Sequence, residues 1–312
     1  MSSWFGSVSS RLEIDLLRLT LRNPVIAASG TFAYGIEFAK VTDLEAIGAF
    51  VVKGISREPM AGNPPPRLWE AEGGMINSIG LQNIGVDAFI RDKLPPLQNV
   101  RTPCFVNVFG YSVGDYVEVV RKLEDADGPA AYELNVSCPN TAHGGMFFSS
   151  DPCLLAEVVG AVKAVATRPV IVKLSPNVAR IEPVAKAAED SGADAISLVN
   201  TFVSLAVDAR RRRSRIGAGF GGLSGPAIKP IALRMVYEAA QAVKVPVIGL
   251  GGIATGEDAA EFLIAGASAV EVGTASFWDP GSTSRIAREL GEFMKAEKIA
   301  NVREMVGTLR LK

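Results

Sequence analysis

The feature that most constrains this chain is a regular alternation between short apolar runs and longer segments of helical periodicity. Eight runs rich in valine and isoleucine predict buried strands at residues 25–28, 50–52, 104–108, 131–134, 170–174, 195–199, 245–250 and 269–272. Apolar residues spaced three or four apart predict helices at residues 113–123, 153–165, 181–191, 227–243 and 256–265. Strands that alternate with helices pair in parallel through crossover connections. Eight such units predict an α/β fold, a (β/α)8 TIM barrel.

The length of the chain permits one domain or two. One barrel of roughly 250 residues accounts for most of the 312 residues. The alternative fold is a doubly wound sheet, which would more naturally carry Gly-x-Gly-x-x-Gly after its first strand, and Ser29-Gly30-Thr31 does not match it. We therefore expect a single barrel domain over residues 1–312. An N-terminal hairpin at 12–21 should precede the barrel, and the long connections at 55–85 and 202–225 should cover its C-terminal face.

Composition excludes several classes of protein. The chain is 48% hydrophobic and 21% charged, and no stretch approaches the ~20 apolar residues of a membrane span. Its start has no secretory signal, so we expect a soluble, cytoplasmic protein without a membrane partner. A net charge of −1 gives no general attraction to nucleic acid. The cysteines, Cys104, Cys138 and Cys153, are odd in number and lack metal-type spacing, which argues against a disulfide framework or a bound metal.

Polar residues and glycines follow the predicted strands, where barrels carry their chemistry. They are Ser29, Gly30, Lys53, Gly54, Asn107, Asn135, Cys138, Lys173, Asn200, Thr201, Gly251, Gly252, Gly273 and Thr274. Turn preferences explain some of the glycines and asparagines. A lysine after an apolar run is costly to bury without a partner, so Lys53 and Lys173 are predicted to contact a ligand. The glycines after the last two strands predict a phosphate site, with tight turns lacking a ligand as the alternative.

The segment Glu-Leu-Asn-Val-Ser-Cys-Pro-Asn at 133–140 converts an apolar strand into a polar turn that carries Cys138. A free cysteine is often a buried small hydrophobe, but the amides of Asn135 and Asn140 favour a polar ligand at this turn. A thiol whose pKa is lowered by nearby cations can accept a proton, so Cys138 is a candidate general base. The only histidine, His143, is either a base or a loop residue, and the loop reading is favoured because Cys138 is better placed.

Three motifs are spread along the chain in a recognisable order. They are Asn-Ser-Ile-Gly-Leu-Gln-Asn at 77–83, the 133–140 segment followed by His-Gly-Gly at 143–145, and Gly-Gly-Leu-Ser-Gly-Pro-Ala-Ile-Lys-Pro at 221–230. Together they resemble the catalytic chain of class 1B dihydroorotate dehydrogenases over nearly the whole length. The resemblance implies oxidation of (S)-dihydroorotate to orotate in pyrimidine biosynthesis, with hydride passing to one bound FMN per chain. It implies that Cys138 removes the C5 proton and that Lys173 steadies charge on the reduced flavin.

The resemblance also implies two sets of ligand residues. The implied FMN contacts are Ser29, Lys53, Gly54, Asn107, Asn135, Lys173, Val199, Gly225, Gly251, Gly252, Gly273 and Thr274, the last four around the phosphate. The implied contacts with orotate are Lys53, Asn77, Ser78, Ile79, Gly80, Leu81, Asn135, Asn140, Asn200 and Thr201. This amide-rich second set suits a flat ring edged with hydrogen-bond donors and acceptors.

The His-Gly-Gly run at 143–145 is similar to the NAD-linked class. That class works with an electron-transfer subunit carrying FAD and a 2Fe-2S cluster, in a heterotetramer around a homodimer core. Three scattered cysteines cannot supply four cluster ligands, so we expect those groups only on a partner. No Gly-x-Gly-x-x-Gly unit between a predicted strand and a predicted helix is evident in this chain, which favours NAD access through that partner.

Other functions stay open at this stage. The fumarate-linked soluble class and a dihydropyrimidine dehydrogenase-like module acting on uracil or thymine are alternatives. A tRNA dihydrouridine synthase or a non-catalytic flavin-binding barrel is also conceivable on this fold. Two local departures from the family pattern are Phe220, before the Gly-Gly pair, and the basic run at 210–213 with Arg215. The basic run is predicted to be a solvated loop face, with contact to nucleic acid or to an acidic patch of a partner as the alternatives.

Overall fold

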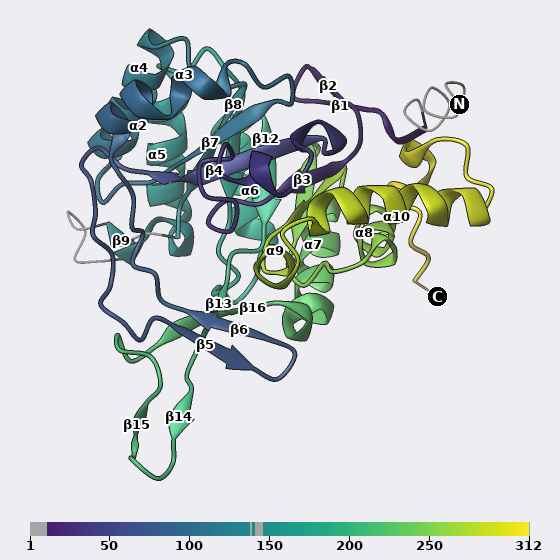
Figure 1. The fold of residues 1–312 in the computed structure, drawn as a ribbon. Coiled ribbons are helices and arrows are strands. Elements are labelled where there is room, and N and C mark those ends of the chain that lie inside the picture. Colours follow the sequence, from purple (N-terminus) through teal and green to yellow (C-terminus); the bar gives the residue numbers. More distant parts are fainter. Residues whose placement is uncertain (1–10, 138, 141–145, 312) are drawn as a thin grey trace.

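Eight parallel strands close into a barrel around the core (Figure 1). The computed structural model describes residues 11–137, 139–140 and 146–311. Around the barrel the strands are β3 (Val25–Ala27), β4 (Ala49–Ile55), β7 (Cys104–Val108), β8 (Ala131–Asn135), β11 (Val170–Lys173), β12 (Ala195–Leu198), β17 (Val247–Leu250) and β18 (Ala269–Val272). The predicted α/β barrel is confirmed, and each predicted strand falls on one of these eight.

The barrel strands are mostly apolar because one face meets the surrounding helices and the other fills the barrel interior. In β3 and β11, for example, Val25, Ile26 and Ile171 are completely buried. Charged side chains break this pattern on the interior: Glu133 in β8 and Glu271 in β18 are also buried. A carboxylate in such a place requires partners, because an isolated buried charge is very costly.

Helices surround the barrel (Figure 1). They are α2 (Val86–Asp92), α3 (Leu94–Leu97), α4 (Val113–Asp125), α5 (Pro152–Lys163), α6 (Glu182–Asp190), α7 (Lys229–Ala242), α8 (Gly256–Ile264), α9 (Ala275–Trp278) and α10 (Ser282–Ala296). Short 3-10 turns are η1 (Phe38–Lys40), η2 (Leu44–Ala46), η4 (Phe148–Ser150), η5 (Pro226–Ile228) and η6 (Val302–Met305). No helix in the described ranges is long and apolar enough to cross a bilayer.

Capping residues explain where two of these helices start. At α4, Ser112 accepts a hydrogen bond from the backbone N–H of Asp115, whose carboxylate accepts one from the backbone N–H of Ser112. Thr255 and Asp258 form the same reciprocal arrangement at α8. Each of these arrangements, known as a capping box, provides acceptors for backbone N–H groups that would otherwise lack a partner at the start of a helix. Both helices begin as the sequence predicts.

Some predicted boundaries are wrong by a few residues. The helix expected at 227–243 is divided into η5 and α7, with prolines in the first turn of each, where a missing N–H is tolerated. The strand expected at 245–250 begins at Val247, because Pro246 has no N–H to donate. The strand expected to end at residue 52 continues to Ile55 with a shifted register against β7. Lys53 therefore belongs to the irregular end of β4 and does not follow it.

The predicted N-terminal hairpin is confirmed, with β1 (Ile14–Leu16) paired antiparallel to β2 (Leu19–Leu21) before β3 begins. A second small antiparallel pair joins β9 (Pro139–Asn140) to β10 (Met146–Phe147). The hairpin and the long connections lie toward opposite ends of the barrel (Figure 1). The C-terminal face is therefore free to be covered by those connections.

The two long connections pair with each other in one antiparallel sheet. Its strands, in spatial order, are β13 (Phe202–Ser204), β16 (Gly221–Ser224), β6 (Gly74–Asn77) and β5 (Leu68–Ala71), and we call it the cover sheet. In its centre Gly222 pairs with Asn77. A further hairpin of β14 (Val207–Asp208) and β15 (Arg213–Ser214) projects beyond it (Figure 1). The predicted cover of the C-terminal face is thereby confirmed.

Candidate active site

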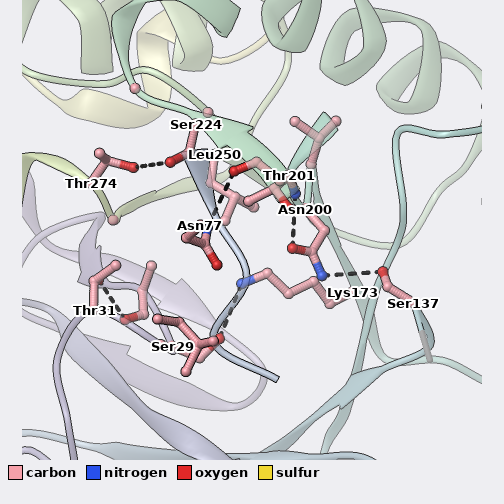
Figure 2. Close-up of a pocket in the computed structure, with 18 of the residues that line it drawn as sticks. Ser29, Thr31, Asn77, Ser137, Lys173, Asn200, Thr201, Ser224, Leu250 and Thr274 are labelled. Atoms are coloured by element: carbon pink, nitrogen blue, oxygen red, sulfur yellow. Dashed lines mark hydrogen bonds between the residues drawn. The ribbon is translucent and has the colours of Figure 1, made fainter. Parts of the chain in front are cut away.

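A cavity of about 570 Å³ lies between the C-terminal ends of the barrel strands and the cover sheet. This volume falls within the range of small-molecule and cofactor sites. Figure 2 shows side chains from both parts of the fold converging on it. The predicted ligand residues that line the cavity are Ser29, Lys53, Gly54, Asn77, Ser78, Ile79, Gly80, Leu81, Asn107, Asn135, Lys173, Val199, Asn200, Thr201, Gly225, Gly251, Gly252, Gly273 and Thr274. Their roles as ligand contacts stay predictions.

Three residues named from the sequence have no described side chain. Cys138, the predicted base, and His143 lie outside the described residues. Asn140 is described only as backbone, in β9. The turn before Cys138 is described: the backbone N–H of Ser137 donates to Asn135 Oδ1 at 3.2 Å. This hydrogen bond holds the chain in a tight turn at the end of β8.

An amide network connects the ends of β8 and β12. Asn200 Nδ2 donates to Asn135 Oδ1 at 3.3 Å and to Ser137 Oγ at 3.1 Å, the latter drawn in Figure 2. The Asn200 carbonyl oxygen Oδ1 accepts from the backbone N–H of Thr201 at 2.8 Å. From the cover sheet, Asn77 Nδ2 donates to the backbone oxygen of Gly222 at 3.3 Å. These contacts fix several amides around one cavity, which suits recognition of a flat polar ring.

Beneath the cavity lies a buried ionic group that we call the floor cluster: Lys173, Glu133 and Glu271. Lys173 Nζ lies 2.9 Å from Glu271 Oε2 and 3.3 Å from Glu133 Oε1. Both carboxylates are fully buried, and Lys173 is 4% exposed. Burial opposes the charge of Lys173, but the two carboxylates outweigh it and raise the pKa of Lys173. The burial of this lysine is thus explained by the protein itself.

The two carboxylates of the floor cluster have unequal surroundings. Glu133 also accepts hydrogen bonds from Asn107 Nδ2 at 2.7 Å and Ser197 Oγ at 2.9 Å. Burial opposes its charge, but Lys173 and these donors together lower the pKa of Glu133. Burial, with the charge of Glu133, raises the pKa of Glu271 to about 8. The pKa values of the two interacting acids therefore differ in direction, one lowered and one raised, as expected when like charges share a site.

Lys53 lines a different wall of the cavity, on β4. Burial, with a smaller contribution from the charge of Arg67, lowers the pKa of Lys53. No carboxylate among the described residues pairs with it. A half-buried cation without an internal partner is suited to bind an anionic group of a ligand.

The glycines after β17 form a cradle of backbone N–H groups that face the cavity. Gly252 has φ +85°, and a Cβ there would lie 2.9 Å from both the carbonyl oxygen of Gly225 and the backbone nitrogen of Lys229. Among the described residues, the backbone N–H groups of Gly251 and Gly252 have no protein acceptor. Free N–H groups where only glycine fits are a common way to hold phosphate. The donor set and the cavity volume therefore fit a mononucleotide cofactor such as FMN.

Sequence reasoning missed several residues of the cavity. Ser175 and Ser224 line it, and Ser224 Oγ accepts from Thr274 Oγ1 at 2.8 Å (Figure 2). The aromatic side chains of Phe277 and Trp278 stand at its edge with 48% and 53% exposure. Glu271, in the floor cluster beneath the cavity, is a further residue that the sequence analysis does not predict. Its signal was present, because a glutamate inside an apolar barrel strand requires a buried cation nearby.

The fold and the cavity define an enzyme of the α/β-barrel class, with its chemistry at the C-terminal ends of the strands. The family model for dihydroorotate dehydrogenase matches residues 11–294. The chain belongs to the dihydroorotate dehydrogenase family, and it is an oxidoreductase. This assignment agrees with the family resemblance of its three motifs.

Similar proteins cover almost the whole chain. A relative from Solibacter usitatus, with the provisional name dihydroorotate dehydrogenase A (fumarate), is 70% identical over 97% of this chain and 100% of its own. Relatives from Citrifermentans bemidjiense and Geobacter sulfurreducens are each 53% identical over 96% of this chain and 98% of their own. Both of these are named dihydroorotate dehydrogenase B (NAD(+)), catalytic subunit. The relatives agree on the substrate in their names and differ on the electron acceptor.

Proposed function

We propose that this chain oxidises (S)-dihydroorotate to orotate in de novo pyrimidine biosynthesis, as a single FMN-binding domain over residues 1–312 in the cytoplasm. The observation that supports it best is that one cavity joins an amide network, a lysine without a carboxylate partner among the described residues, and a glycine cradle. These three features correspond to a polar ring, its carboxylate and the phosphate of a nucleotide cofactor. FMN, when bound, supplies the acceptor for the hydride that leaves C6 of the substrate.

The residues of the chain have separate tasks in this proposal. Asn77, Asn135 and Asn200 orient the ring through amide hydrogen bonds, and Lys53 attracts the carboxylate. Cys138 takes the C5 proton as its thiolate. Gly251 and Gly252 hold the phosphate through backbone N–H groups. The cover sheet keeps bulk water away from the reacting carbons.

We further propose that the physiological acceptor is NAD, reached through a separate subunit carrying FAD and a 2Fe-2S cluster. Two observations support this. Several relatives are named catalytic subunits of an NAD-linked enzyme. The Gly-x-Gly-x-x-Gly match at residues 217–222 lies between two strands, β15 and β16, and not between a strand and a helix as in a dinucleotide-binding unit. No group of cysteine, histidine or acidic residues that could hold a metal occurs in the described ranges. The assembly that follows is a homodimer of this chain flanked by two partner subunits.

The second candidate is a fumarate-linked enzyme that needs no partner. It is supported by the name of the relative that is 70% identical. The two candidates share the oxidation of dihydroorotate and differ only in how the cofactor is reoxidised. Reoxidation is therefore the step that separates them.

Anaerobic bleaching of the bound flavin by dihydroorotate tests the shared half-reaction. The purified protein should be yellow and lose its colour on mixing. Cys138→Ser should keep the flavin but slow bleaching by on the order of 10²–10⁴, because it removes the general base. Cys153→Ser, at an exposed position, is the matched control and should bleach at the normal rate. Normal bleaching by Cys138→Ser would reject the base assignment.

Reoxidation of the bleached protein separates the acceptors. We expect no recovery of the yellow colour with NAD alone and rapid recovery with NAD plus the FAD and iron–sulfur subunit. Recovery with fumarate alone, at the rate of substrate oxidation, would establish the second candidate. Fast NADH formation by the isolated chain would contradict both.

A further inference from the structure

The floor cluster contains one cation, which is 4% exposed, and two carboxylates that are fully buried. Its members come from three barrel strands: Glu133 from β8, Lys173 from β11 and Glu271 from β18. Only Lys173 of the three lines the cavity. If all three groups were ionised, the cluster would carry a net charge of −1 directly below the proposed flavin site. A buried excess charge is strongly unfavourable.

The hydrogen bonds of the cluster distinguish its two carboxylates. The carboxylate of Glu133 accepts a hydrogen bond from Lys173 Nζ. It also accepts hydrogen bonds from the side chains of Ser29, Asn107 and Ser197. Glu271 accepts a hydrogen bond from Lys173 Nζ on Oε2. Its other oxygen, Oε1, is buried without any hydrogen-bond partner in the described part of the chain. The ionised form of Glu133 is therefore stabilised by several hydrogen bonds, whereas an ionised Glu271 would have only the one from Lys173 among the described residues.

The surroundings of Glu271 favour its neutral form. The charged groups that act on it are Glu133 and Lys173. Burial, followed by repulsion from Glu133, raises the pKa of Glu271 to about 8, although Lys173 acts in the opposite direction. With a proton on Glu271, the cluster is one ion pair and one neutral acid, with a net charge of zero.

We propose that Glu271 is a positioning residue, protonated at neutral pH, that keeps the charge of Lys173 from being over-neutralised, so that the cavity floor stabilises an anionic reduced cofactor. The inference rests on the proposed FMN site above Lys173. When Glu271 loses its proton to solvent at alkaline pH, the floor gains one negative charge. Reduction of the cofactor becomes less favourable, because like charges repel across a medium of low dielectric constant.

The reduction potential of the bound flavin, measured against a reference dye over a range of pH, tests the proposal. In the wild-type protein, the ratio of reduced to oxidised flavin should fall by on the order of tenfold beyond the ordinary pH effect as Glu271 ionises. Glu271→Gln keeps the shape of the side chain but cannot ionise, so this extra fall should vanish. Glu257→Gln, at an exposed position on α8, is the matched control and should behave as wild type. Parallel curves for wild type and Glu271→Gln would overturn the proposal.

Infrared spectroscopy supplies a readout that does not need the flavin. A carbonyl band of a protonated carboxylic acid should be present at about pH 6 and lost by about pH 10. It should be absent from Glu271→Gln and retained in Glu257→Gln. Absence of the band in wild type would refute the protonated state. If the purified protein were colourless, the proposed FMN site would be rejected. The infrared measurement would still decide whether Glu271 carries a proton.

Discussion

Lys53 and Lys173 line the same cavity from different strands, but their surroundings are opposite. Lys173 is 4% exposed and lies between Glu133 and Glu271. Lys53 is half-buried and has no carboxylate partner in the described ranges. Burial acts against the charge of both lysines, but the pKa of Lys173 is raised by its partners and the pKa of Lys53 is lowered.

The comparison shows that burial of a lysine does not by itself indicate a ligand. The charge of Lys173 belongs to the folded protein and would be present in any ligand state. The charge of Lys53 has no carboxylate partner in the part of the chain that the structure describes, which suits it to an anionic substrate. The two lysines should therefore respond differently to substitution: Lys173 through stability and the cofactor, Lys53 through the substrate.

The largest effect is expected from Lys173→Met. Removal of this cation leaves the buried carboxylate of Glu133 without its ion-pair partner, and breaking a buried ion pair costs about 3–5 kcal/mol in the free energy of unfolding. Urea denaturation followed by circular dichroism measures it. The control is Lys186→Met, which breaks only exposed pairs on α6 and should change stability little. Equal stability of Lys173→Met and wild type would show that the floor cluster has no structural role.

Lys53→Met should leave the free energy of unfolding nearly unchanged, because no internal ion pair is broken. The affinity for orotate should fall about 10- to 100-fold, the range expected for loss of a hydrogen bond to a charged group. Titration of the flavin absorbance with orotate measures this affinity. The comparison between the lysines would fail if Lys53→Met unfolded as easily as Lys173→Met.

Glu271→Gln should change how thermal stability depends on pH. The pKa of Glu271 is raised from 4.5 to about 8 on folding, so the native state holds more protons than the unfolded state between these values. Stability of the wild type should therefore fall as pH rises through this window. As pH rises through this window, the Tm of Glu271→Gln should therefore increase relative to the Tm of the wild type. Scanning calorimetry of the two proteins, without added ligand, measures it, and a constant difference would contradict the raised pKa.

The smallest effect is expected from Arg67→Gln on the cover-sheet side of the cavity. Arg67 donates to Gln82 Oε1 at 2.8 Å, and its charge helps to lower the pKa of Lys53. Without that charge, the pKa of Lys53 should rise, so binding of orotate should persist to higher pH. The change should be at most about 1 kcal/mol at alkaline pH, because water screens the pair. Orotate titrations at a series of pH values measure it, and an unshifted alkaline limb would exclude the influence of Arg67 on Lys53.

Much of the fold is present in local patterns of the sequence. Short apolar runs separated by helical periodicity are properties of neighbouring residues, so the strands of the barrel could be predicted one at a time. The positions after those strands follow directly, which is why Lys53, Asn135, Lys173 and Gly252 could be expected around one cavity. Errors occurred where prolines or an irregular pairing shifted a boundary, as at Val247 and at the end of β4.

The sequence by itself determined the strands, their alternation with helices and the polar residues at their ends, because each depends on contacts along the chain. Only the tertiary structure decided that the two long connections pair as the cover sheet, through Asn77 and Gly222. It also decided that Lys173 lies against Glu133 and Glu271, while Lys53 has no carboxylate partner among the described residues. Such pairings depend on distances between side chains far apart in the chain, and closure of the barrel sets those distances.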